Sequence, residues 1–321
     1  MSDAVAIRAA DAVRRDVPDS GAYAWYVLII LLGLYMMNYA DRYLAAGLLG
    51  PIKADFGASD AFLGFLIGPA FAIFYTVAAV PIARYADRAA RIRIIAAGAL
   101  IWSCFTMLSG LAPDAWSFAA ARVGVGLGEA AFLAPAYSLL SDYFPPRRRA
   151  LAFGVMSLGV YLGQLLGLIG GGAIAEASHW RNAFVLLGIP GVLLALTALV
   201  TVREPRRGRL DHVPVAPAPP MRFVEVVRVL SALASYRHIL IGSALGGFGG
   251  MAFGMWGPTL FVRAFDLPLA EANARFGIAF GMSGLAGALA CGWLSDRLSV
   301  HGASARLRLG GFALTSNTIV M

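Results

Sequence analysis

The sequence is poor in charge and in the side chains that carry most catalytic chemistry. Only 14% of its 321 residues are charged, and it has two cysteines, four histidines and a single lysine, Lys53. Cys104 and Cys291 both fall within apolar segments, where a thiol acts as a small hydrophobic group. They therefore give no support to a disulfide framework.

The few histidines argue against several classes of enzyme. His179, His212, His238 and His301 lie in loops or at the ends of apolar segments, and none has a second histidine or a cysteine at metal-ligand spacing. A membrane haem protein needs a histidine within a span, and a serine hydrolase needs one beside a buried serine. The phosphate-binding pattern G-x-x-x-x-G-K-[ST] is also missing. We therefore expect no enzyme, no metal site and no cofactor.

Apolar residues dominate the chain instead. They make up 59% of it, and the mean hydropathy of +0.73 exceeds that of a soluble globular protein. Apolar windows of about 20 residues can cross a hydrocarbon core of about 30 Å as helices, and the alternating pattern of a membrane barrel is missing. The sequence predicts an all-α membrane protein with eight complete spans and part of a ninth, at about residues 22–49, 61–79, 94–111, 115–143, 151–175, 182–202, 239–261, 272–294 and 309–321.

The net charge of +8 comes from arginines that gather in alternate loops. The clusters lie at Arg84–Arg93, Arg147–Arg149 and Arg203–Arg209, and the loops between them are poorer in arginine. Cytoplasmic loops carry this excess, so we expect the clusters and the N-terminus in the cytoplasm, in a multi-pass protein of a bacterial inner membrane. Nucleic-acid binding would need one continuous basic surface. Here the positive charges are divided among separate membrane loops, so we expect no nucleic-acid partner.

Changes in composition divide the chain into four predicted regions. Residues 1–20 are polar and lack the apolar run and cleavage site of a signal peptide, which predicts a cytoplasmic tail. Residues 21–202 are predicted to form an N-terminal six-helix bundle. Residues 203–237 are a cytoplasmic linker, rich in proline, with an amphipathic helix at about 221–235. Residues 238–321 are predicted to form part of a C-terminal bundle.

Two short patterns recur in the second half of the chain. The stretch A-R-Y-A-D-R at 83–88 has the same internal spacing as G-W-L-S-D-R at 292–297, and each follows the second span of its half. Gly50-Pro51 and Gly257-Pro258 likewise close the first span of each half. Repeats of this kind indicate an internal duplication.

Four charged residues lie within the spans of the first half, away from the ends of those spans: Asp41, Arg42, Arg122 and Glu129. A charge at the centre of a bilayer costs about 2.5 to 3.5 kcal/mol on insertion scales, so charges kept there indicate function. Seven residues separate Arg122 from Glu129, close to two helical turns, which turns both side chains to one side. We predict that the four residues form one substrate and proton-coupling site. The alternatives are a neutralised Asp41–Arg42 pair at a helix end and an Arg122–Glu129 pair that only fixes packing.

Other polar and aromatic residues within the spans are candidates to line a central cavity. The glycines of the fifth span recur at mostly four-residue spacing and predict a surface for close helix packing. The cavity candidates are Asn38, Tyr39, Tyr161, Gln164 and Trp256.

The arginine loop after the second span has two interpretations. Its charges either fix the topology of the chain or form a cytoplasmic gate that locks the two bundles together on the inside. In the second interpretation an acidic residue at the end of the fourth span is the partner, and the repeat contributes a second copy of the loop. The predicted gate comprises Asp87, Arg88, Arg91, Asp142, Asp296 and Arg297.

Several of these stretches resemble a known family. A-R-Y-A-D-R-A-A-R-I-R at 83–93 resembles the signature loop of the major facilitator superfamily. N-Y-A-D-R at 38–42, R-V-G-V-G-L-G-E-A at 122–130 and R-E-P-R-R-G at 203–208 are similar to the spinster family of lipid transporters. Hexuronate and aldonate symporters share part of these motifs.

The resemblance extends over about residues 24–308 and implies a major facilitator fold of twelve helices in two six-helix bundles. This chain ends within the predicted ninth helix, so we expect a fragment of such a protein. One departure is that Ala83 and Ala90 stand where the signature loop usually has glycine, which should tighten the packing there.

The resemblance implies a secondary transporter that opens alternately to the two sides of the membrane. Asp41 and Glu129 are the expected proton carriers, because a carboxylate that is alternately hydrated and desolvated can bind and release a proton. Arg42 and Arg122 suggest an anionic substrate, since guanidinium binds carboxylate and phosphate in bidentate fashion.

The resemblance favours an amphipathic anion of the lysolipid or sphingoid phosphate type, and hexuronates or aldonates are the alternative. A lipid-sensing membrane scaffold that transports nothing is a second alternative. The expected partners are therefore membrane lipids, protons and the substrate, and we expect a monomer.

The arginine clusters give a testable topology. We expect a cysteine in place of Arg148 to be labelled by a membrane-impermeant maleimide only after the cells are opened, because the positive-inside rule places that loop in the cytoplasm. A cysteine in place of Asp266, in a loop on the other predicted side, is the matched control. Labelling of the Arg148 position in intact cells would reverse the topology.

Overall fold

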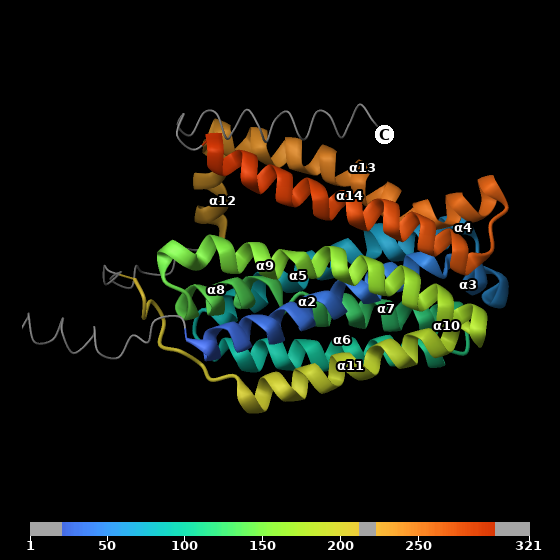
Figure 1. Ribbon diagram of the computed structural model, residues 1–321, viewed down its shortest axis with the longest axis horizontal. Coiled ribbons are helices and arrows are strands. Elements are labelled where there is room, and N and C mark those ends of the chain that lie inside the picture. Colours follow the sequence, from blue (N-terminus) through green and yellow to red (C-terminus); the bar gives the residue numbers. More distant parts are fainter. Residues whose placement is uncertain (1–20, 212–222, 299–321) are drawn as a thin grey trace, which may run out of the picture.

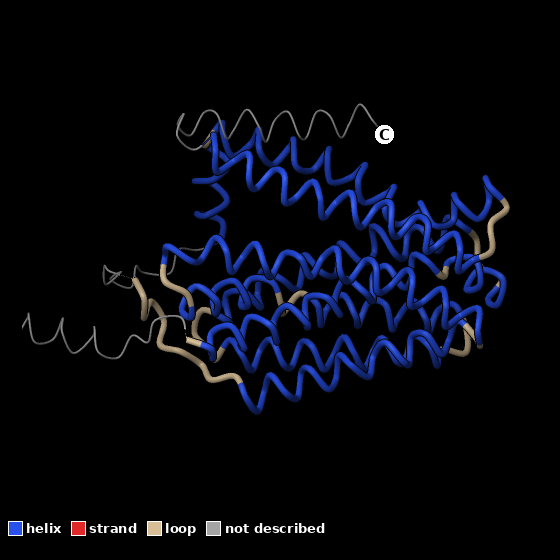
Figure 2. The backbone as a smooth tube through the Cα atoms, viewed as in Figure 1, coloured by secondary structure: helices blue, strands red, loops and turns tan. Residues whose placement is uncertain are grey.

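The computed structural model describes residues 21–211 and 223–298, and these ranges contain helices and loops but no strand (Figure 1, Figure 2). Eight of the helical segments are long and apolar enough to cross a membrane. The chain is thus a multi-pass, all-α membrane protein, as predicted. The expected tail at 1–20, the proline-rich stretch at 212–220 and the ninth span at 309–321 lie outside the described residues.

The first half of the chain contains six spans, and several of them are interrupted. Pro69 lies in one interruption, a π-helical turn, because proline has no N–H to donate to the helical ladder. The elements are α2 (Ala22–Gly47), α3 (Leu49–Phe56), α4 (Asp60–Phe65), η1 (Leu66–Ala70), α5 (Phe71–Ala86), α6 (Arg91–Leu111), α7 (Ala115–Glu129), α8 (Leu133–Tyr143), α9 (Pro146–Leu165), η2 (Leu166–Gly170), α10 (Gly171–Ala177) and α11 (Trp180–Thr201).

The fourth span is not the continuous helix that the sequence predicts. A turn at residues 130–132 separates α7 from α8, with the Phe132 N–H bonded to the Glu129 carbonyl at 3.1 Å. Pro135 lies in the first turn of α8, where a backbone N–H has no helical partner. The break therefore places Glu129 at the last position of α7.

The second half of the described chain consists of α12 (Phe223–Ala232), α13 (Ala234–Phe265) and α14 (Leu269–Leu298). The predicted amphipathic helix corresponds to α12, although it is shorter than expected, because α13 begins at Ala234 rather than near residue 239. In Figure 1, α13 and α14 lie together on one side of the first half. They approach it near α3, α4 and α10 and diverge from it towards α12.

Helix α2 occupies the centre of the first half. Val27, Leu28 and Leu31 on this helix are completely buried. Helix α9 packs closely along it, since a Cβ added at Gly163 would collide with the Met36 carbonyl of α2. Gly159 and Gly167 meet the α2 backbone in the same way, so the predicted packing role of these glycines is confirmed.

The arginine clusters all lie at one end of the first half, which we call the arginine-rich end. The two halves meet at the other end, called here the opposite end. There the Arg263 side chain of α13 binds the Asp60 carboxylate of α4, with an Nη2–Oδ1 distance of 2.8 Å, and Lys53 Nζ lies 3.0 Å from Asp60 Oδ2. The Trp256 ring of α13 rests on Gly64 of α4. These contacts join the halves around the end of α2 that follows Asp41 and Arg42.

The close packing of α9 on α2 can be tested with two glycines of the same helix. We expect Gly163→Ala to lower the thermal midpoint in detergent, with a loss of about 1 to 3 kcal/mol, because the new methyl group has no space against α2. Gly154 has open space at its Cβ position, so Gly154→Ala should leave the midpoint unchanged or raise it. Equal midpoints for both variants would mean that α9 is free to move away from α2.

Candidate functional site

The four predicted charges come from two helices that lie at the centre of the first half. Asp41 and Arg42 are consecutive on α2, and Arg122 and Glu129 are two turns apart on α7. The Asp41, Arg122 and Glu129 residues are 2%, 3% and 1% exposed, and the Arg42 side chain is 15% exposed. The structure therefore brings all four together, away from water, as a group that we call the charge quartet.

The quartet pairs crosswise between the two helices. Arg122 Nη1 lies 2.7 Å from Asp41 Oδ2. Arg42 donates from Nε to Glu129 Oε2 at 2.6 Å, and its Nη2 lies 2.5 Å from the same oxygen. The alternative Arg122–Glu129 pair within α7 is therefore not formed. Each of these residues pairs with a residue of α2 instead, Arg122 with Asp41 and Glu129 with Arg42.

Thr106 of α6 adds a third helix to the Asp41 pair. Its hydroxyl donates to Asp41 Oδ1 at 2.6 Å and is buried. A second acceptor, the Trp102 carbonyl, lies 2.9 Å from the same hydroxyl. Threonine within an apolar span is common, so the sequence alone gave no signal for this contact.

Arg42 differs from Arg122 in its surroundings. Its guanidinium carbon lies 4.8 Å from the centre of the Phe71 ring, 5.2 Å from that of Tyr39 and 5.3 Å from that of Tyr75. Such positions over ring faces stabilise a cation where water is scarce. Arg42 is therefore the more accessible cation, held between Glu129 and three aromatic rings.

The predicted cavity residues are distributed over three places. Tyr39 lies beside Arg42, and Asn38 is buried one residue earlier on α2. Gln164 donates to the Tyr43 hydroxyl at 2.9 Å, between α9 and α2. Tyr161 packs on Gly284 of α14, and Trp256 packs on Gly64, so both lie where the two halves meet.

The predicted gate residues separate into a buried and an exposed set. Arg91 is 1% exposed; its Nη1 lies 2.5 Å from Asp142 Oδ2 and its Nε lies 2.7 Å from Glu204 Oε1. Asp87 and Arg88 are exposed, and neither is among the partners of Asp142 in the described chain. The suggested partnership of Asp142 with these two is therefore replaced by one with Arg91. The side chains of Asp296 and Arg297 lie outside the described residues.

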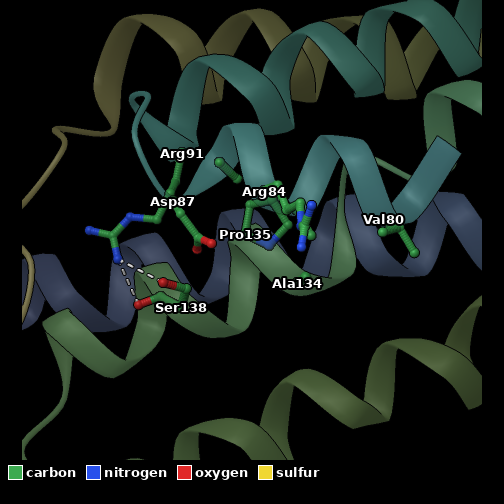
Figure 3. Close-up of a pocket in the computed structure, with 9 residues that line it drawn as sticks. Val80, Arg84, Asp87, Arg91, Ala134, Pro135 and Ser138 are labelled. Atoms are coloured by element: carbon green, nitrogen blue, oxygen red, sulfur yellow. Dashed lines mark hydrogen bonds between the residues drawn. The ribbon is translucent and has the colours of Figure 1, made fainter. Parts of the chain in front are cut away.

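A cavity of about 280 Å³ opens beside this network, between the end of α5 and α8 (Figure 3). Its lining includes Val80, Arg84, Asp87, Pro135 and Ser138. Figure 3 shows Arg91 at one end of it, hydrogen-bonded to Ser138.

The segment at 203–211, predicted as the beginning of a linker, is bound to the first half. Glu204 accepts from Arg91 and from the Ile92 N–H, and the Gly208 N–H donates to Asp142 Oδ1 at 2.9 Å. Asp211 Oδ1 lies 2.7 Å from Arg149 Nη2. The segment thus acts as a strap across the arginine-rich end and belongs structurally to the first half.

Among the described residues, no group of three or more His, Cys, Asp or Glu side chains is placed to hold a metal ion. The quartet itself consists of two carboxylates and two guanidinium groups, joined in two ion pairs.

Comparison with known proteins places this arrangement in a family. A sequence profile described as the Major Facilitator Superfamily matches residues 31–320. The chain belongs to the major facilitator superfamily. It is 32% identical to an MFS-type efflux pump of Mycolicibacterium smegmatis over 276 residues. This match covers 86% of this chain and 63% of the pump. Over 232 residues it is 31% identical to the sphingosine-1-phosphate transporter SPNS2 of Danio rerio, covering 71% of this chain and 46% of that protein.

A solved structure is also similar to this member of the superfamily. It is the crystal structure of a bacterial homologue of the human lysosomal transporter spinster, in an inward-facing and unoccupied conformation. The identity is 32% and the TM-score 0.77, with 88% of this chain and 64% of that one covered. These matches confirm the resemblance to the spinster family. The chain spans less than two thirds of the length of each of these relatives.

The strap makes a prediction about stability. We expect Asp142→Ala to lower the thermal midpoint strongly, by a loss of about 3 to 5 kcal/mol, because it leaves the buried Arg91 without its closest carboxylate. Asp211→Ala removes an exposed pair at the end of the strap and should change stability by less than about 1 kcal/mol. Similar midpoints for Asp142→Ala and the wild type would show that Glu204 alone neutralises Arg91.

Proposed function

We propose that this chain forms part of a secondary active transporter that alternates between openings on the two sides of the membrane and couples proton movement to an amphipathic anion. The observation that carries the proposal is the charge quartet, with two ion pairs crossing between α2 and α7. Buried pairs of this kind cost desolvation free energy and are a poor source of stability. Their presence within apolar helices favours a role in binding and coupling.

The proton and the substrate bind the two opposite members of one ion pair, Glu129 and Arg42. Glu129 holds Arg42 through a pair of contacts to one oxygen, so a proton on Glu129 removes the charge that retains Arg42. The freed guanidinium is the more accessible of the two arginines and can bind a phosphate or carboxylate in bidentate fashion. Proton and anion then bind with positive coupling, because each favours the state in which Glu129 and Arg42 are apart.

Asp41 and Arg122 form the second, more enclosed pair. The Thr106 hydroxyl binds Asp41 Oδ1 and Arg122 lies on Asp41 Oδ2, so each carboxylate oxygen already has a partner with which a proton must compete. We assign this pair the role of a second coupling site, whose protonation loosens α2 from α6 and α7.

The surroundings of Arg42 support an amphipathic substrate. Phe71, Tyr39 and Tyr75 enclose the guanidinium with aromatic faces, which suit an apolar chain attached to a charged head. SPNS2, a relative at 31% identity, is named for the transport of sphingosine 1-phosphate, which has this chemistry. We therefore propose lysolipid or sphingoid phosphates as the substrate class, with hexuronates and aldonates as the alternative that the test must distinguish.

The substrate class can be tested by ligand-dependent stabilisation. Sphingoid phosphates and lysophospholipids should raise the thermal midpoint of the wild type, and the Arg42→Ala variant should bind them about 10- to 100-fold more weakly, as expected for a lost charge-assisted contact. Arg181→Ala is a control, because that arginine pairs with Asp55 away from the quartet. Stabilisation by aldonates alone would transfer the proposal to sugar acids.

The coupling can be tested with Glu129→Gln, which mimics the protonated carboxyl. In the full-length protein we expect this variant to keep substrate counterflow in liposomes and to lose accumulation driven by a pH gradient. Substrate affinity should rise as the pH falls in the wild type and should change less with pH in the variant, since Arg42 is already free there and only the Asp41 site still titrates. Accumulation that persists in Glu129→Gln and in Asp41→Asn would place the coupling elsewhere. Binding without any counterflow in the wild type would indicate a scaffold.

A further inference from the structure

A buried amide of α14 lies at the point where α2 ends. Asn273 is completely buried, although it is on the second half of the chain. Its Nδ2 donates to the Gly47 carbonyl, the last of α2, at 3.0 Å. The Oδ1 atom of Asn273 has no hydrogen-bond partner among the described residues. Burying an amide costs desolvation free energy, which only its hydrogen bonds offset, and here one of its two polar atoms has none.

The Gly47 carbonyl needs this donor because its own helix cannot supply one. In a continuous helix it would accept from the N–H of residue 51, but that residue is Pro51, which has none. The next rung of the ladder is present, since the Ile52 N–H donates to the Leu48 carbonyl at 3.1 Å. Pro51 therefore removes the rung that would join Gly47 to residue 51, and a side chain from the other half donates to the Gly47 carbonyl in its place.

Two glycines make the space that Asn273 occupies. A Cβ added at Gly47 would lie 3.0 Å from Asn273 Nδ2, and one added at Gly172 of α10 would lie 2.9 Å from the same atom. Leu168 closes the space from η2. The amide is thus held in a fitted socket formed by three segments of the first half.

The internal repeat places a proline at the corresponding position of the second half. Pro258 lies within α13, which continues through it to Phe265 without a break. The bond from Asn273 acts on the other proline site, at the end of the helix that carries Asp41 and Arg42.

We infer that Asn273 is a positioning residue that holds the two halves together at the opposite end, and we call this contact the latch. Its amide supplies the hydrogen-bond donor that the Gly47 carbonyl lacks because Pro51 has no N–H. This inference rests on the proposed function, because alternating access requires that end to open. Opening separates α14 from α2 and leaves both the carbonyl and the amide to be hydrated. The net contribution of one such bond is small, so the latch biases the two openings without preventing either.

The latch can be tested by distances across the opposite end. Spin labels at Ala54 of α3 and Ala264 of α13, both exposed, report its opening after Cys104 and Cys291 are replaced by serine. We expect Asn273→Leu to raise the ratio of open to closed distances by about 2- to 10-fold, the range for one lost hydrogen bond. Ser283→Ala is the control, because the Ser283 hydroxyl bonds only within α14, to the Phe280 carbonyl.

The reason for the latch can be tested separately with Pro51→Ala, which gives residue 51 an N–H. In that background the effect of Asn273→Leu should shrink, because Gly47 then has a donor from its own helix. Distances in Asn273→Leu that superimpose on those of the wild type would overturn the inference, and so would an undiminished effect in the Pro51→Ala background. If Asn273→Leu does not fold, Gly172→Ala displaces the amide by crowding and should shift the distances in the same direction.

These outcomes are independent of the proposed transport. If the distances respond to Asn273→Leu but the protein shows no counterflow, the inference about the latch stands and the proposed function is wrong. If the protein shows proton-driven accumulation but the distances do not change in Asn273→Leu, the proposed function stands and the inference about the latch is wrong.

Discussion

The structure depends on keeping four charges in a medium that does not solvate them. Asp41, Arg42, Arg122 and Glu129 each have an oppositely charged partner on another helix, and this condition fixes how α2 and α7 lie against each other. Hydrophobic burial cannot determine that register within a membrane, since lipid chains are as apolar as the helix faces. The ion pairs favour one register, because each of them joins one residue of α2 to one residue of α7 and a broken pair leaves a buried charge.

The rest of the first half supports these pairs. Glycines of α9 allow it to lie against the α2 backbone, and Thr106 connects α6 to Asp41. At the arginine-rich end the strap binds Arg91 and Asp142, which holds the ends of several helices in one body. The first half is therefore held together by its own contacts, and the proposed alternation between two openings takes place between it and α13 and α14.

The contacts between the halves differ in kind from those within the first half. They include an exposed cluster at Asp60, a glycine under Trp256 and the single amide of Asn273. Exposed ion pairs and single hydrogen bonds each contribute little, so no one of them commits the protein to one arrangement. Contacts of this kind can break and re-form in the alternation that we propose, while the buried ion pairs keep α2 and α7 together.

The sequence by itself determined the class of protein, the positions of the spans and the residues of the quartet. It could do so because membrane helices follow from local hydropathy, and because a charge within an apolar span is visible without any knowledge of its neighbours. The signature loop and the N-Y-A-D-R stretch also pointed to the superfamily that the comparisons then confirmed. Only the tertiary structure decided the pairing, since Arg122 and Glu129 share a helix face and yet bind Asp41 and Arg42. It likewise decided that Asp142 binds Arg91, that residues 203–211 form a strap and that Asn273 reaches Gly47. Each of these contacts joins residues far apart in the chain, and their distance depends on how whole helices pack, which no local pattern encodes.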